Sequence, residues 1–145
     1  GGVRLGAPAT GRVQPEPNRE AGPADIFQIG ATPDKTGHPR RWDTRQFPKA
    51  GRAGELVALA SGRPGHAAAL PIHADATLFG ATLLAGQSIV HTLDHGRQAY
   101  LVIVAGDVHA HGEALEARAG VTITDVATIT LTATADSEFL IAGLP

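Results

Sequence analysis

Residues 85–106, AGQSIVHTLDHGRQAYLVIVAG, decide the fold of this chain. They predict a strand at 88–90, a turn at 94–96 and a second strand at 100–104. Every position of the second strand is apolar, whereas a strand with one face in water alternates apolar and polar residues. We therefore expect both faces of this strand to be covered, inside a sandwich or barrel and away from its edge.

Short β-strands continue on both sides of this stretch. Residues 75–84 alternate between two sets of side chains, and residues 129–134 alternate Ile or Leu with Thr. Between them, residues 108–116 predict a hairpin with a tight turn at residues 111–113. About eight strands at a spacing of roughly ten residues, without a helical period, predict an all-β jelly-roll sandwich or small barrel. The other expected strands are 26–30, 56–59, 70–72, 121–124 and 138–142.

Composition narrows the function classes. The chain has 145 residues, which predicts one domain, and a formal net charge of -2, so nothing favours binding to nucleic acid or to an anionic membrane. No apolar run reaches the roughly 18 residues that a membrane span needs, and no signal peptide is recognisable. The absence of cysteine excludes disulfides, thiolate nucleophiles and thiolate metal sites. We therefore expect a cytoplasmic protein.

The N-terminal region differs from the rest. Residues 1–23 are rich in Gly, Pro and charge, and we interpret them as a flexible arm or linker ahead of a domain at 24–145. Trp42, the single tryptophan, lies in a polar segment. It either anchors an interface or closes one end of the core.

Three segments of the domain resemble a known family. They read LPIHADATLFGATLLAGQSIVHTL, GRQAYLVIVAGDVHAHGEALEARAGVTITD and TLTATADSEFLIAGLP. Their order is similar to the C-terminal cupin half of the pirin family, bicupins often called quercetinase-like. The resemblance implies a single cupin, a jelly-roll β-barrel or double-stranded β-helix, with an irregular N-terminal arm. Residues 2–5 are similar to the end of the first cupin half, with Leu5 where that half usually has histidine, so the arm is a remnant of the half that normally binds metal.

The resemblance also implies where a cupin metal would bind. Metal-bearing cupins bring three imidazoles and one carboxylate together inside the barrel around Fe, Mn, Ni or Cu. Aligned on the glycines of the two cupin motifs, the four ligand positions fall on Leu93, His95, Ala99 and Leu131. Only His95 is a metal-binding residue type. We therefore expect no metal cofactor.

A different pair of histidines could still form a site. His91 shares a strand face with His95 if the chain stays extended, so the two could orient a small molecule or bind a metal weakly. Alternatively, His91 is a hydrogen-bonded barrel residue and His95 a turn residue. Arg97 and Tyr100 are further candidates for the mouth of a ligand pocket, because arginine binds carboxylates and phosphates bidentately.

His109 and His111 share a strand face by the two-residue period. Val108 and Ala110 take the apolar positions of that hairpin, so both histidines should point to solvent. A surface pair of this kind can capture Zn or Ni during purification. Any metal found there would be adventitious.

Two functions from different classes remain open. The first, which we favour, is a non-catalytic binding or oligomerisation module. A bicupin half normally packs against its sister, so this half should expose an apolar face, covered by homodimerisation or by a separate protein that replaces the first half.

The second is a small monocupin enzyme without identified catalytic residues. It would act on a small aromatic molecule in the barrel, either as a quercetin 2,3-dioxygenase-like dioxygenase with Fe, Mn, Ni or Cu, or as a metal-independent isomerase. A redox metal bound at stoichiometry by barrel residues would favour this enzyme.

Overall fold

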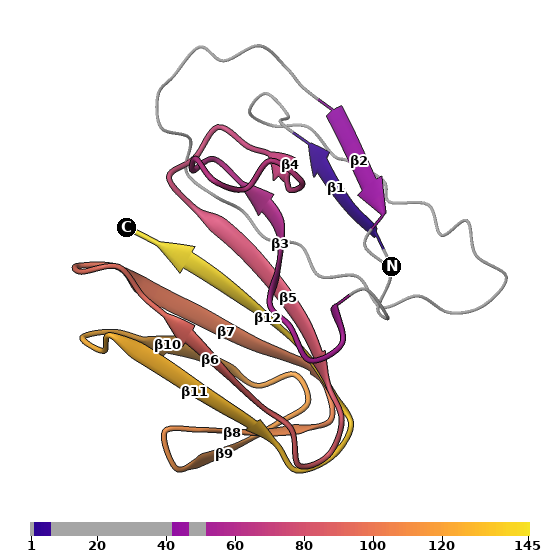
Figure 1. Ribbon diagram of the computed structural model, residues 1–145, viewed down its shortest axis with the longest axis vertical. Coiled ribbons are helices and arrows are strands. Elements are labelled where there is room, and N and C mark those ends of the chain that lie inside the picture. Colours follow the sequence, from indigo (N-terminus) through magenta and orange to yellow (C-terminus); the bar gives the residue numbers. More distant parts are fainter. Residues whose placement is uncertain (1, 7–41, 47–51) are drawn as a thin grey trace, which may run out of the picture.

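The computed structural model describes the backbone of residues 2–6 and 42–46 and all atoms of residues 52–145. The first two segments are strands β1 (Gly2–Gly6) and β2 (Trp42–Gln46), which pair antiparallel (Figure 1). Part of the predicted arm is therefore a strand. The prediction missed this strand because pairing between Gly2 and Gln46 is a long-range contact that local composition does not report. The rest of the arm, the strand expected at 26–30 and the side chain of Trp42 lie outside the described residues.

Six strands form the larger sheet. Its order is β10 (Gly120–Ile123), β7 (Gln98–Ala105), β12 (Ser137–Leu144), β5 (Thr77–Leu83), β3 (Val57–Ser61) and β4 (Leu70–Pro71). Neighbouring strands are antiparallel except β3 and β4, which are parallel.

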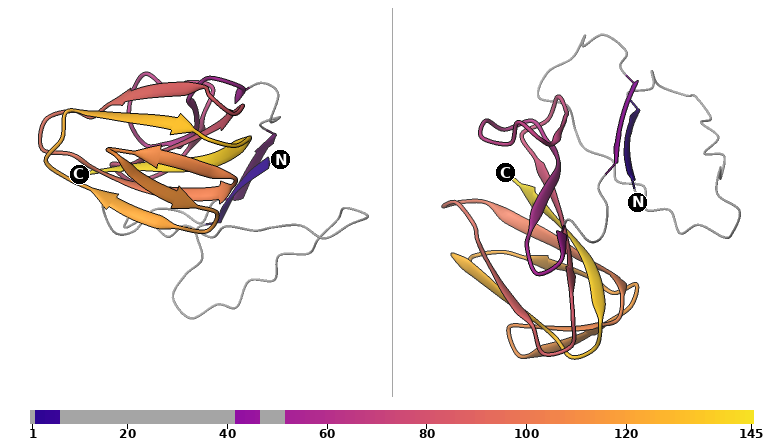
Figure 2. Two further views of the ribbon diagram at one scale, coloured as in Figure 1. Left: turned by 90° about the horizontal axis from the view of Figure 1, so that it is seen from below. Right: turned by 45° about the vertical axis from the view of Figure 1, so that its right-hand side comes forward.

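The smaller sheet has four antiparallel strands and covers one face of the larger one. Its order is β6 (Ser88–Thr92), β11 (Thr128–Ala133), β8 (Asp107–Ala110) and β9 (Glu113–Glu116). The two sheets face each other (Figure 2), and buried side chains of both form one hydrophobic core. This confirms the all-β prediction. No helix in the described part of the chain is long and apolar enough to cross a membrane.

The core lies on the inner faces of the sheets. Along β12, Phe139 and Ile141 point inward and are fully buried, whereas Leu140 and Ala142, which alternate with them, point outward and are half-buried. Strand β11 repeats this pattern with Ile129 and Leu131 buried. The two-residue period of a strand thus assigns alternate side chains to the core.

Strand β7 departs from its prediction on one face. It lies between β10 and β12, so its interior position is confirmed. Leu101 and Ile103 are buried, but Tyr100 is 43% exposed and Val102 is only half-buried on the outer face of the six-stranded sheet. The expectation that both faces are covered is therefore wrong for this outer face. An apolar sequence shows that a face is hydrophobic, not that another layer packs on it.

The hairpin of β8 and β9 is confirmed. His111 and Gly112 connect the strands with positive φ angles of 49° and 80°. Two-residue hairpin loops with positive φ at both positions match the twist of the flanking strands. Glu113 already belongs to β9, one residue earlier than predicted.

Candidate functional site

A cavity of about 200 Å³ opens between the two sheets, beside the carboxyl end of β12. Strands of both sheets contribute its inner lining, and the loop after β3 and the turn between β6 and β7 contribute its rim. The lining includes the side chains of Arg63, His66, Phe79, His91, Leu93, Asp94 and Arg97.

Phe79 forms the centre of an aromatic group in the cavity. It lies on the inner face of β5, opposite Ile141 of β12. The ring of His66 contacts it edge to face, with a centroid distance of 5.6 Å. The ring of His91, on β6, lies 4.9 Å from it at an angle of 59°. These contacts bring together residues from a loop and from both sheets.

His91 is held in its neutral form. It is half-buried, and burial lowers the pKa of its imidazole below the ordinary value of 6.5 because the charged form loses hydration. The negative charge of Asp94 acts in the opposite direction with a smaller effect. At neutral pH the His91 ring therefore offers one hydrogen-bond donor and one acceptor to the cavity.

The lowered pKa of His91 makes stability depend on pH. The unfolded chain binds a proton at His91 near pH 6.5, whereas the folded chain does so only at lower pH. We expect the free energy of unfolding to fall as pH drops from about 7 to about 5, and to fall less in His91→Gln. Urea unfolding at several pH values measures both slopes. The exposed His109→Gln variant should keep the wild-type slope, and equal slopes in all three proteins would contradict this prediction.

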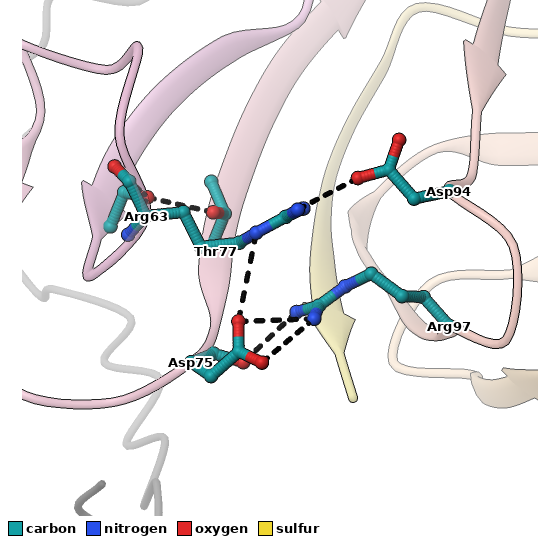
Figure 3. Close-up of polar contacts among 6 residues, drawn as sticks. Arg63, Asp75, Thr77, Asp94 and Arg97 are labelled. Carbon is teal, nitrogen blue, oxygen red and sulfur yellow. Dashed lines mark hydrogen bonds and ion pairs between the residues drawn. The ribbon is translucent and has the colours of Figure 1, made fainter.

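Arg63, Asp94 and Arg97 of the cavity lining form an ion-pair network with Asp75, which lies outside that lining (Figure 3). Arg63 donates to Asp94 at 2.8 Å and lies 3.6 Å from Asp75. Arg97 donates to both carboxylate oxygens of Asp75 at 3.0 Å and to its backbone carbonyl at 2.9 Å. The Arg63 hydrogen bond and charge lower the pKa of Asp94, so this carboxylate stays ionised at neutral pH. The ion pairs connect the loop after β3 to the turn between β6 and β7.

A buried hydroxyl pair positions Arg63. Ser61 and Thr77 are hydrogen-bonded at 2.7 Å, and the backbone N–H of Arg63 donates to the Ser61 hydroxyl at 3.1 Å. Both hydroxyl residues are buried at the ends of β3 and β5. The loop that carries Arg63 is therefore anchored to the sheet (Figure 3).

The structure brings only part of the predicted set together. His91 and Arg97 line the cavity, whereas His95 is exposed in its turn and Tyr100 lies on the opposite face of the six-stranded sheet. Neither His95 nor Tyr100 lines the cavity, because the turn carries the first away from it and the strand period turns the second outward.

Sequence reasoning missed Arg63, His66 and Phe79. The inward set of the alternating stretch at 75–84 contains Phe79, so the pattern could have found this residue. Arg63 and His66 come from a loop whose sequence carries no periodic signal.

Three of the four positions aligned with cupin metal ligands provide no donor atom, and the fourth, His95, is exposed. Leu93, Ala99 and Leu131 are buried and belong to the hydrophobic core. Within the described residues, no group of three or more His, Asp or Glu side chains could hold a metal ion. These residues do not fit the metal centre of metal-bearing cupins. His109 and His111 are exposed, as their hairpin pattern predicted.

Comparison with known families accounts for this barrel. Residues 58–144 match the quercetinase C-terminal cupin domain. The chain belongs to the pirin family. A pirin-like protein of Caulobacter vibrioides is 41% identical to this pirin cupin over 141 residues, which are 97% of this chain and 61% of that protein. A Pseudomonas aeruginosa protein provisionally named a quercetin 2,3-dioxygenase is 44% identical over 141 residues, with the same two coverages of 97% and 61%. The pirin cupin thus spans about three fifths of the length of these relatives.

Solved structures agree with the family. The crystal structure of YhhW from Escherichia coli superposes on this pirin cupin with a TM-score of 0.72 and 27% identity, over 78% of this chain and 47% of that one. A second structure, described as bacterial pirin YhhW in complex with nickel(II), gives a TM-score of 0.71 and 26% identity over the same coverages of 78% and 47%. The predicted resemblance to the C-terminal pirin cupin is confirmed.

Proposed function

We propose that this pirin cupin is a non-catalytic binding and association module that works without a transition-metal cofactor. The observation that carries the proposal is the hydrocarbon at the ligand positions: Leu93, Ala99 and Leu131 pack in the core. Transition metals in proteins need imidazole, carboxylate or thiolate donors, and aliphatic side chains provide none. Binding rather than redox chemistry is the role that such a barrel retains.

An apolar strip on the outer face of the six-stranded sheet supports association. Val102 of β7 lies opposite Leu140 of β12, and Tyr100 lies opposite Ala142. The ring of Tyr100 is exposed, and the other three side chains are half-buried. We propose that a second copy of the chain covers this strip, because a two-fold contact is the commonest way to bury such a face.

The cavity favours an enzyme as the second candidate. The half-buried, neutral imidazole of His91 faces a space that a small molecule could enter, and an Escherichia coli relative named quercetin 2,3-dioxygenase is 30% identical over 120 residues. The cavity volume of about 200 Å³ lies below the roughly 300–1,000 Å³ of typical small-molecule sites. A small monocupin dioxygenase or a metal-independent isomerase would therefore have to act on a substrate smaller than a flavonoid.

Metal content tests the proposal. The untagged protein would be expressed with Fe, Mn, Ni, Cu and Zn available, purified without nickel resin, and measured by mass spectrometry of the elements. We expect metal well below one atom per chain and no quercetin-dependent oxygen uptake, because three of the four ligand positions lack a donor atom. Sedimentation equilibrium on the same sample should give twice the chain mass.

Two histidine variants provide the matched control. Near-stoichiometric Fe, Mn, Ni or Cu that is lost in His91→Ala but kept in His109→Ala would refute the proposal and support the enzyme. Zinc that is lost only in His109→Ala would be bound at the surface and would be consistent with the proposal. A monomer that binds a different protein through the strip would refute only the proposal that a second copy of the chain covers the strip.

A further inference from the structure

The cavity combines an aromatic floor with a rim that carries two arginines, each paired with a carboxylate. Phe79 and Leu93 give it an apolar surface, and the guanidinium groups of Arg63 and Arg97 stand at its edge. A ligand that satisfied both parts would carry a flat apolar body and a negative charge. The volume of about 200 Å³ restricts that body to a single small ring.

The two arginines differ in how firmly they are held. Arg97 is mostly buried and makes three hydrogen bonds to the carboxylate and backbone carbonyl of Asp75. Arg63 is 36% exposed, and its closest ion pair is with Asp94, whose side chain is 64% exposed. Exposed ion pairs contribute little free energy, because water solvates the separated charges well. Another carboxylate can therefore replace Asp94 on Arg63.

We propose that this cavity binds a small aromatic carboxylate, with its ring against Phe79 and its carboxylate on Arg63 in place of Asp94. Arginine recognises a carboxylate through two parallel hydrogen bonds, which fixes the direction of the ligand. The neighbouring rings of His66 and His91 extend the aromatic surface around Phe79. This inference rests on the proposed function, in which the barrel binds a ligand without converting it.

The neutral state of the His91 ring is compatible with such a ligand. Burial lowers the pKa of His91, so the ring is neutral and offers polar contacts without competing with Arg63 for the carboxylate. The Ser61 hydroxyl holds the backbone of Arg63, so the guanidinium is presented from an anchored loop. The site is thus built before the ligand arrives.

Titration of the full chain with benzoate tests the inference. Calorimetry measures the affinity, and amide chemical shifts locate the binding site. We expect saturable binding at one site, with the largest shifts at Phe79, His91 and Arg63. Benzamide, which has the same ring but no charge, should bind about tenfold more weakly. Arg63→Gln should weaken benzoate binding by about tenfold for the same reason.

Asp94→Asn should change the affinity in the opposite direction. Because it removes the carboxylate that competes for Arg63, we expect benzoate to bind roughly threefold more tightly. This residue is exposed, so the variant should fold normally. Arg118→Gln, in the turn between β9 and β10 and outside the cavity lining, is the matched arginine control and should bind benzoate like the wild type.

Three results would overturn the inference: no saturable binding, equal affinity for benzoate and benzamide, or unchanged affinity in both Arg63→Gln and Asp94→Asn. Each of these would leave the proposed function intact if the protein remains metal-free. A stoichiometric redox metal would refute the proposed function whatever the benzoate titration shows. The two failures are therefore distinguishable.

Discussion

Replacing Phe139 by alanine is expected to lower the free energy of unfolding by about 3–5 kcal/mol. Phe139 is fully buried, and in β12 it lies opposite Ala81 of β5 and Ile103 of β7. Removing the ring loses its transfer free energy and leaves a cavity between the sheets, because the neighbouring strands are hydrogen-bonded on both sides and cannot close the space. Urea denaturation measures the loss.

Leu140→Ala is the matched control for this substitution. Leu140 is the next residue of the same strand, but it points to the outer face and is half-buried. We expect its loss to be about 1 kcal/mol in the monomer, which is the state to compare because Leu140 also belongs to the strip that we propose for association. Equal losses at the two positions would contradict the assignment of the core to the inner face.

Gly106→Ala is expected to destabilise the protein by about 3 kcal/mol or more. Gly106 joins β7 to β8 with φ of 81°, in the left-handed region that L-residues avoid. A Cβ atom there would overlap the Ser137 hydroxyl oxygen and the Asp136 carbonyl oxygen. The Ser137 hydroxyl accepts from the backbone N–H of Asp107 and donates to its carbonyl, so a methyl group would also disrupt this junction. Thermal and urea unfolding measure the effect.

Gly96→Ala separates backbone strain from steric overlap. Gly96 has φ of 76°, close to that of Gly106, but nothing lies within 4 Å of its Cβ position. We expect it to cost about 1–2 kcal/mol, the conformational part alone. If Gly106→Ala cost no more than Gly96→Ala, the close packing of the β7–β8 junction against Ser137 would be wrong.

Periodicity and turn chemistry predicted most of the barrel. The alternation at 75–84 and 129–134 became β5 and β11, and the hairpin turn fell at His111 and Gly112. These signals are local, because a strand exposes alternate side chains to opposite faces whatever its partners are. The pairing of β1 with β2 escaped this reasoning because its two segments are separated by 35 residues of sequence, from 7 to 41.

The candidate site was harder to predict than the fold. His91 and Arg97 were found from one strand-turn-strand stretch, but Arg63, which completes the rim, comes from a loop that no pattern ties to that stretch. His95 was aligned with a cupin ligand position and is exposed instead. The difference arises because sequence spacing fixes the face of a residue only while the strand stays extended, and here β6 ends at Thr92.

The sequence by itself determined the β-strands, the pirin family and the residue types at the cupin ligand positions, since these depend on the order of side chains along the chain. Only the tertiary structure decided that Tyr100 lies outside and that Phe79, His66 and His91 share one cavity. It also decided that Arg63 reaches Asp94 across the cavity mouth. The physical reason is that these contacts join loops and strands of both sheets, and their distances are set by sheet pairing and not by sequence separation.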